Sequence, residues 1–296
     1  NIPLILTTDV NTNRQAFQTN PAEIYEQIKK DLNEAIAGFS NIADLDPSTT
    51  RANKWAAISM MARVHLFNEE WENAATLASE VIASGLYSPL ENPSNVFKAN
   101  SKETILELWN QNGFIADGTS LIPASGIPQY IIAPDLLNSF EDSDLRKSDW
   151  IHSVSVNNVT YFYPHKYRNR TNNQTSPEYL KLFRISEQYL IRAEARFHLE
   201  DINGGLDDLN TIRERAGLSP LLEGHPLEVY LQELIKERRL EFFGEWGHRF
   251  LDLKRVGLLN QTMANLKPTW DSKSIVLPIP STEIIYNPSL AQNNGY

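Results

Sequence analysis

The chain has 296 residues, and its 27 Lys and Arg against 37 Asp and Glu give a formal net charge of −10. An acidic surface repels phosphate, so nucleic-acid binding through counterion release is disfavoured. The absence of cysteine excludes disulfides, thiolate catalysis and cysteine-held metal clusters, and no apolar run reaches the roughly 18 residues of a membrane span.

The first residues do not resemble a translation start. Asn1 is not preceded by Met, and residues 1–6 lack the basic region and the small-residue cleavage site of a signal peptide. We therefore expect a mature, cleaved or truncated start.

The first strong helical pattern covers residues 20–39. Asn20 is a suitable N-cap, and Pro21 suits the first helical position. A polar stretch over residues 40–50, containing Asp46 and Pro47, is expected to end this helix. Apolar residues recur three or four positions apart and form one stripe: Ile24, Ile28, Leu32, Ala35, Ile36 and Phe39.

Two further helical pairs are predicted, over residues 54–84 and 186–217. Each has an Ala-x-x-His element on its first helix, at Ala62 to His65 and at Ala195 to His198. This spacing is close to the tetratricopeptide pattern, in which small residues let two helices approach. We expect both histidines to pack between helices, and we predict an all-α fold of tetratricopeptide-like helical pairs, an α/α superhelix on which other helices stack.

Residues 86–180 break the helical pattern with prolines, asparagines and glycines between short apolar runs, which indicates loops and minor strands. A loop-rich segment held by helices is usually functional, so we expect the binding surface here. Helices are expected again over residues 226–243 and 245–255, followed by an extended segment over residues 275–280. The predicted organisation is one domain over residues 1–296, with helical pairs over residues 20–85 and 186–255.

Catalytic signatures are missing from the sequence. There is no nucleophile elbow, dinucleotide fingerprint or His-Glu-x-x-His motif, and Thr119 stands where the phosphate loop beginning at Gly113 would need Lys. We therefore predict no catalytic residue, no cofactor and no metal site. Alternating charges near the carboxyl end are expected to form a structural lattice of Arg–carboxylate pairs: Glu237, Arg238, Arg239, Glu241, Glu245, Arg249, Asp252 and Arg255.

Aromatic and polar residues gather in the loop-rich insertion. Sugar rings stack their C–H faces on flat aromatic side chains, and their hydroxyls pair with planar polar groups. The alternative is that residues 161–163 form a strand with one face in the core. The stacking interpretation predicts ligand contacts at Tyr130, Trp150, Tyr161, Tyr163, Arg168 and Asn172.

Several motifs, taken in this order, resemble the SusD/RagB family of nutrient-binding surface lipoproteins of Bacteroidetes. They are Arg51-x-x-Lys54-x-Ala56-Ala57, Phe140-x-x-x-Asp144-x-Arg146, Glu187-x-Tyr189-Leu190-x-Arg192, Glu237-Arg238-Arg239-x-Glu241 and Pro278-Ile-Pro280.

The resemblance implies a lipid-anchored protein at the cell surface, on the outer membrane, that binds oligosaccharide without turnover for a SusC-like TonB-dependent transporter. It also implies that the usual amino-terminal region with its lipid-bearing cysteine is missing, and that Tyr167 belongs to the scaffold. Three alternatives remain open: a peptide-binding member of the same family, a helical-repeat adaptor for protein partners, and a glycoside hydrolase, whose paired carboxylates depend on the fold.

Overall fold

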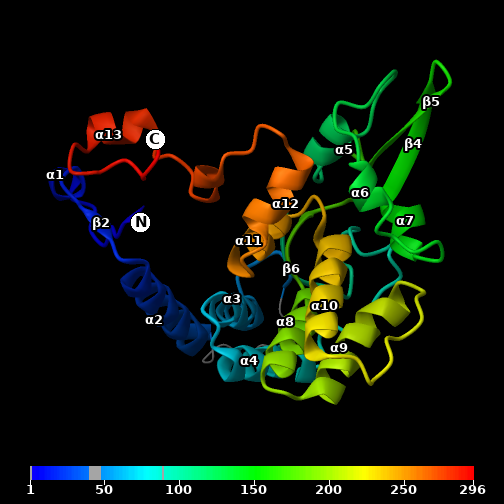
Figure 1. Cartoon of the computed structure of the whole chain (residues 1–296), viewed down its shortest axis with the longest axis horizontal. Coiled ribbons are helices and arrows are strands. Elements are labelled where there is room, and N and C mark those ends of the chain that lie inside the picture. The colour runs from blue at the N-terminus through cyan, green and yellow to red at the C-terminus, as the bar shows by residue number, and fades with distance from the viewer. Residues whose placement is uncertain (1, 40–47, 89) are drawn as a thin grey trace. The chain divides into compact units, whose positions relative to one another are not determined.

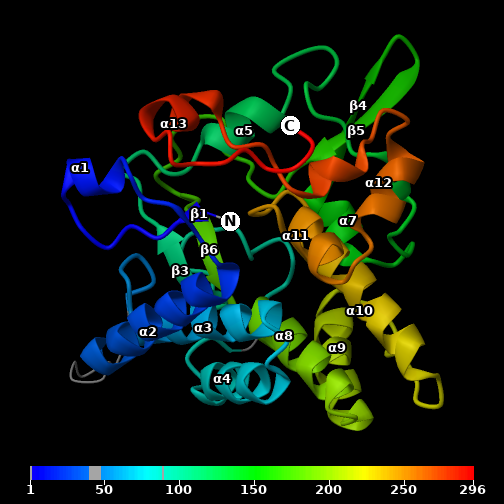
Figure 2. The ribbon, with the colours of Figure 1, turned by 60° about the vertical axis from the view of Figure 1, so that its left-hand side comes forward.

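The computed structural model describes residues 2–39, 48–88 and 90–296. These residues form two compact units, one of residues 2–34 and 247–296 and the other of the described residues between 35 and 246. The two units are drawn in Figures 1 and 2 and are described separately below. Asp46 and Pro47, which we expected to end the first helix, lie outside the described residues.

The smaller unit joins the two ends of the chain through short elements. Asn287 Nδ2 donates a hydrogen bond to the carbonyl oxygen of Ala16 at 2.8 Å. The extended segment predicted over residues 275–280 is wrong at Ile275, which ends a 3-10 helix, whereas Val276 has an extended backbone and residues 277–280 form neither helix nor strand. Its elements are β1 (Ile2–Pro3), α1 (Val10–Asn13), β2 (Gln18–Thr19), α11 (His248–Arg255), α12 (Leu259–Leu266), the 3-10 helix η1 (Ser272–Ile275) and α13 (Ser281–Tyr286), with β1 and β2 antiparallel.

The helix α2 (Pro21–Phe39) begins in the smaller unit and ends in the larger one. It confirms the prediction for residues 20–39. Asn20 Oδ1 accepts a hydrogen bond from the Ala22 N–H at 2.9 Å, as an N-cap side chain does.

The larger unit is built around one central helix. Its main helices are α3 (Lys54–Phe67), α4 (Trp71–Ala83), α8 (Ile185–His198), α9 (Ile202–Arg215) and α10 (Leu227–Phe242). Helix α8 packs against the other four, and Figures 1 and 2 both show α8 beside α9 and α4. Buried alanines let α3, α4 and α8 approach closely: Ala62, Ala74, Ala78 and Ala195. The predicted all-α fold with two tetratricopeptide-like pairs is confirmed.

Of the two histidines of the repeated element, His198 packs between helices as predicted. The His198 ring stacks on Trp71, with ring centroids 4.0 Å apart and planes inclined by 9°. His65 Nδ1 contacts the Glu70 carboxylate at the turn between α3 and α4.

The loop-rich insertion has two small antiparallel ribbons, as expected. In the first, Glu107 on one strand faces Lys181 on the other, and in the second Val154 faces Tyr161. The second ribbon is the hairpin at the upper right of Figure 1. The elements are β3 (Thr104–Leu108), α5 (Ala116–Leu121), α6 (Pro134–Leu137), α7 (Leu145–Trp150), β4 (Ile151–Val156), β5 (Val159–Pro164) and β6 (Leu180–Arg184), where β3 pairs with β6 and β4 with β5.

A buried charge lattice connects the insertion to the helices. The carboxylate of Glu241 on α10 accepts hydrogen bonds from Arg146, Arg184 and Arg215 at 3.2, 2.8 and 2.6 Å. Burial by itself would raise the pKa of Glu241, but these three guanidinium groups hold it well below its usual range. The predicted lattice is therefore confirmed at Glu241.

Two neighbours of Glu241 on the same face extend the lattice. Glu237 lies 2.6 Å from Arg146 Nη1, and Glu245 lies 2.7 Å from Lys166 Nζ and 2.9 Å from Arg184 Nη2. All of these side chains are buried. A charge in such surroundings is tolerated because it is paired and hydrogen-bonded.

Replacing Arg146 by Met is expected to lower the free energy of unfolding by about 3–5 kcal/mol, because the change leaves buried carboxylates without their cation. The matched control is Lys147→Met at the next position, where the exposed pair with Asp142 spans 3.4 Å and the expected change is within about 0.5 kcal/mol. Urea titration followed by circular dichroism measures both. Equal destabilisation by the two variants would contradict the structural role of the lattice.

Candidate functional site

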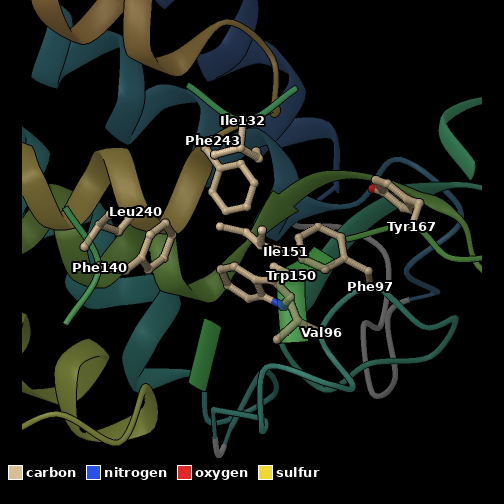
Figure 3. Close-up of a cluster of buried hydrophobic side chains, with 9 residues drawn as sticks. All are labelled: Val96, Phe97, Ile132, Phe140, Trp150, Ile151, Tyr167, Leu240 and Phe243. Carbon is tan, nitrogen blue, oxygen red and sulfur yellow. The ribbon is translucent and has the colours of Figure 1, made fainter. Parts of the chain in front are cut away.

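Two of the predicted ligand contacts are wrong, because their side chains are buried. Trp150 has no exposed surface, and Tyr163 is 6% exposed. Trp150 lies in an aromatic core cluster, where Figure 3 shows it among Phe97, Ile151 and Phe243. Tyr163 Oη lies 3.3 Å from His152 Nδ1 across the β4–β5 ribbon. The alternative of a strand with one face in the core is correct for Tyr163.

The polar partner of Trp150 is a buried cation. Lys166 Nζ lies 4.5 Å from the centroid of the Trp150 ring and 4.2 Å from that of Phe243, and the indole N–H of Trp150 donates to the Pro93 carbonyl oxygen at 2.8 Å. Burial lowers the pKa of Lys166 to about 8, against the opposing influence of Glu245. These aromatic faces therefore stabilise an internal ammonium group and are unavailable for stacking on a ligand.

Tyr130 and Tyr161 are accessible, and their backbone segments lie side by side. Tyr130 is 50% exposed, and Tyr161 is half-buried on β5. The N–H of Ile132 donates to the Phe162 carbonyl oxygen at 2.8 Å, which places the segment of Tyr130 along β5. Both tyrosines stay candidate contacts.

Arg168 and Asn172 share one loop, which a buried carboxylate anchors. Glu178, 4% exposed, accepts hydrogen bonds from the backbone N–H groups of Arg168 at 2.9 Å and Asn169 at 3.0 Å. Burial raises the pKa of Glu178, and these two donors act in the opposite direction by stabilising its charged form. The guanidinium of Arg168 donates to the Asp149 carbonyl oxygen at 3.0 Å, whereas Asn172 is exposed.

The short helix α5 packs against this loop. Gly118 touches it so closely that an added Cβ would lie 2.2 Å from the Asn169 carbonyl oxygen. Thr119 Oγ1 donates to the Arg170 carbonyl oxygen at 3.2 Å. The contact allows no side chain larger than hydrogen at position 118, so α5 and the loop of Asn169 hold each other in place.

The turn after β3 and the loop of Asn172 present exposed amides that hydrogen-bond to one another. Asn172 Nδ2 donates to Asn112 Oδ1 at 3.3 Å, and Gln174 Nε2 donates to Asn172 Oδ1 at 2.6 Å. Trp109, 60% exposed, immediately precedes the turn that presents Asn112, in which the Gly113 N–H donates to the Asn110 carbonyl oxygen at 2.9 Å. We call Trp109, Asn112, Asn172 and Gln174 the amide surface.

The sequence argument missed Trp109 although its signal was present. An aromatic residue followed by Asn110, Gln111 and Asn112 is the same combination that drew attention to residues 161–173. Trp246 was also missed. It is 49% exposed, has a φ of +43°, and donates from its indole N–H to the Lys181 carbonyl oxygen at 2.6 Å.

Comparison with known proteins shows the family of the chain. The sequence profile of the SusD family matches residues 138–296, which is more than half of its length. The chain belongs to the SusD family. The starch-binding protein SusD of Bacteroides thetaiotaomicron is 35% identical over 131 aligned positions, which cover 40% of this chain and 21% of that protein.

Longer alignments have lower identity. The SusD-like protein P25 of Formosa agariphila is 23% identical over 349 aligned positions that cover 94% of this chain. The chain spans 66% of the length of P25 and 69% of that of the SusD-like protein P38 from the same organism.

Solved structures share the fold of this SusD-family chain. A SusD superfamily protein from Bacteroides vulgatus superposes with a TM-score of 0.82 at 21% identity. The superposition covers 100% of this chain and 73% of the Bacteroides vulgatus chain. A structure titled as a laminarin-binding SusD-like protein gives 0.78 at 24% identity, with coverage of 100% and 74%. Surface glycan-binding protein A from Bacteroides uniformis gives 0.81 at 21% identity, with coverage of 99% and 73%.

A stacked histidine pair beside the candidate residues predicts acid sensitivity. The rings of His152 and His165 are 4.5 Å apart, and burial, together with His152 and Arg168, lowers the pKa of His165 to about 4. Between pH 6.5 and 4 the unfolded chain binds a proton at His165 that the folded chain does not, so stability falls as the pH drops through this window.

His165→Gln is therefore expected to flatten the dependence of Tm on pH between 6.5 and 4, as measured by differential scanning calorimetry. His225→Gln is the control, because His225 stands apart from the stacked pair and its substitution leaves the slope unchanged. A wild-type slope in His165→Gln would contradict this assignment.

Proposed function

We propose that this SusD-family protein binds extracellular oligosaccharide without chemical turnover, and that the amide surface is its recognition site. The observation that supports the proposal is a set of three exposed amides joined by hydrogen bonds, together with the 60% exposed Trp109 indole three residues before Asn112 in the sequence. Relatives named as starch-binding, laminarin-binding and surface glycan-binding proteins support the same class of ligand.

The chemistry of the amide surface suits a neutral sugar. An exposed indole offers a flat apolar face to the C–H groups of a pyranose ring. Each amide supplies one acceptor and two donors in a plane, which matches neighbouring sugar hydroxyls. Tyr130 and Tyr161 on their adjacent segments offer further stacking faces. Arg168 provides a donor near the same loop, although Asp149 engages part of its guanidinium.

We further propose that the bound glycan passes to a SusC-like TonB-dependent transporter at the outer-membrane surface, where a lipid anchor holds the full-length protein. Family membership supports this role. Across residues 2–39, 48–88 and 90–296, every helix falls short of the length or apolarity needed to cross a bilayer.

Trp109→Ala is expected to weaken the retardation of the protein in laminarin or starch affinity gels by about tenfold, because stacking on one aromatic ring contributes roughly 1–2 kcal/mol. Phe17→Ala removes a 73% exposed aromatic ring outside the amide surface and is expected to leave retardation unchanged. Two results together would favour the peptide-binding alternative. The protein would bind oligopeptides, and Trp109→Ala would be retarded as strongly as the wild type in every glycan gel. Release of reducing ends would favour the hydrolase.

A tagged full-length protein, purified from the native cell envelope in mild detergent, is expected to carry an outer-membrane TonB-dependent transporter with it, identified by mass spectrometry. An untagged strain is the control for non-specific recovery. Recovery of the protein without any such transporter, while glycan binding is retained, would contradict the delivery role and leave the binding role intact.

A further inference from the structure

Contacts from other parts of the chain cover both outer edges of the β3–β6 ribbon. On β3, the Glu107 N–H donates to the Thr49 carbonyl oxygen at 2.8 Å. On β6, the Lys181 N–H donates to Tyr167 Oη at 2.9 Å, and the Lys181 carbonyl oxygen accepts the indole N–H of Trp246 at 2.6 Å. Edges that are covered in this way do not pair with further strands.

The outer edge of β5 in the second ribbon is covered too, because the Phe162 carbonyl oxygen accepts the Ile132 N–H at 2.8 Å. This bond also fixes the direction of the backbone groups on β4. In an antiparallel pair, opposite residues alternate between those whose backbone groups face the partner strand and those whose groups face away. Phe162 faces away from β4 and lies opposite Ser153, so the N–H and C=O of Ser153 face the outer edge of β4. The same alternation directs the groups of Ser155 outward and those of Val154 toward β5.

The outer edge of β4 has no such cover. Among the residues that the structure describes, the outward backbone groups of Ser153 and Ser155 have no hydrogen-bond partner, and both side chains are exposed. Proteins usually protect an open edge with proline, charged side chains or a bulge. The sequence of β4, Ile-His-Ser-Val-Ser-Val, has no proline and no Lys, Arg, Asp or Glu, and its pairing with β5 is regular. This edge is therefore open to another strand.

A small depression lies at the base of the open edge and has a volume of about 150 Å³. Sites that hold whole small molecules measure about 300–1,000 Å³, so this depression suits a single side chain. A residue placed opposite Ser153 on an added strand would direct its side chain to the face of Ser153, which is part of the lining. The lining is formed by Leu137, Lys147, Ile151, His152, Ser153 and Phe162, in which Leu137, Ile151 and Phe162 favour an apolar side chain.

We propose that the outer edge of β4 binds an extended polypeptide segment of a partner protein, which adds to the ribbon as a further strand. The backbone of the segment exchanges hydrogen bonds with Ser153 and Ser155, and an apolar side chain opposite Ser153 enters the depression. The occupant is a polypeptide because another extended backbone repeats donors and acceptors at the two-residue spacing of a strand. This interaction does not involve Trp109 or the rest of the amide surface, so it is independent of the proposed glycan binding.

The first test is amide hydrogen exchange of the wild-type chain, measured by nuclear magnetic resonance at two protein concentrations. The amides of Ser153 and Ser155 are expected to exchange at least tenfold faster than those of Val154 and Val156, because the latter face β5. Equally slow exchange of all four would overturn the proposal, since the edge would already be covered. Slower exchange of the two serines at the higher concentration would assign the edge to a second copy of the chain and would also overturn it.

The second test adds a probe, the acetylated and amidated peptide Thr-Val-Thr-Leu-Thr-Val-Thr, to the wild-type chain. It is expected to slow exchange at Ser153 and Ser155 by at least tenfold. The control is the same peptide with N-methylated leucine and valines, which keeps the apolar side chains and lacks the donors that face β4. No slowing by the probe, or equal slowing by both peptides, would overturn the proposal.

A matched pair of variants locates the contact. Ser155→Pro removes one outward N–H from β4 and is expected to weaken binding of the probe by about fivefold, the loss expected of one hydrogen bond. Thr160→Pro is the control, because Thr160 lies opposite Ser155 and faces the other edge. Both variants lose the same contact between Ser155 Oγ and Thr160 Oγ1, which are 3.1 Å apart. Wild-type affinity in Ser155→Pro, or an equal loss in both variants, would overturn the assignment.

Discussion

The larger unit depends on one buried carboxylate that three arginines share. Glu241 on α10 is paired with Arg146 from α7, Arg184 from the end of β6 and Arg215 from the end of α9. A buried charge left without its partner is strongly destabilising, so none of these elements can move away from the others at low cost. The lattice thereby fixes irregular segments of the insertion to a helical scaffold. The lattice holds these segments in position, because the short strands of the insertion form few hydrogen bonds of their own.

That rigidity explains how loops can present a recognition surface. The loop of Asn172 is held by backbone donors to Glu178, and α5, which follows the turn of Asn112, packs against this loop through Gly118. Polar side chains on such braced loops meet a ligand with little further loss of conformational entropy. Aromatic residues in the same unit have divided roles. Trp150 stabilises an internal ammonium group from the core, and Trp109 is left on the surface.

Two polar features of the larger unit differ in chemistry. The residues of the amide surface are exposed and uncharged, which suits a neutral glycan. The depression beside β3, which Thr104 helps to line, is open to solvent and is lined mostly with hydroxyl groups. Both lie next to the β3–β6 ribbon, because Trp109 follows the last residue of β3 and Thr104 is its first.

The sequence by itself determined the helices and their pairing, because the apolar period of residues 20–39 and the alanines at positions 62 and 195 express local and nearest-neighbour packing directly. It also identified Glu237, Glu241 and Glu245 as scaffold residues from their alternation with arginines. The tertiary structure alone decided which aromatics are exposed, because burial depends on what distant segments bring to each ring. Trp150 and Tyr163 lie in the core because Lys166, Phe243 and His152 pack against them, whereas Trp109, directly after β3, is 60% exposed. The residues that neighbour each ring along the chain do not encode that difference in burial. The difference in burial is the reason that the candidate site includes Trp109 and not Trp150.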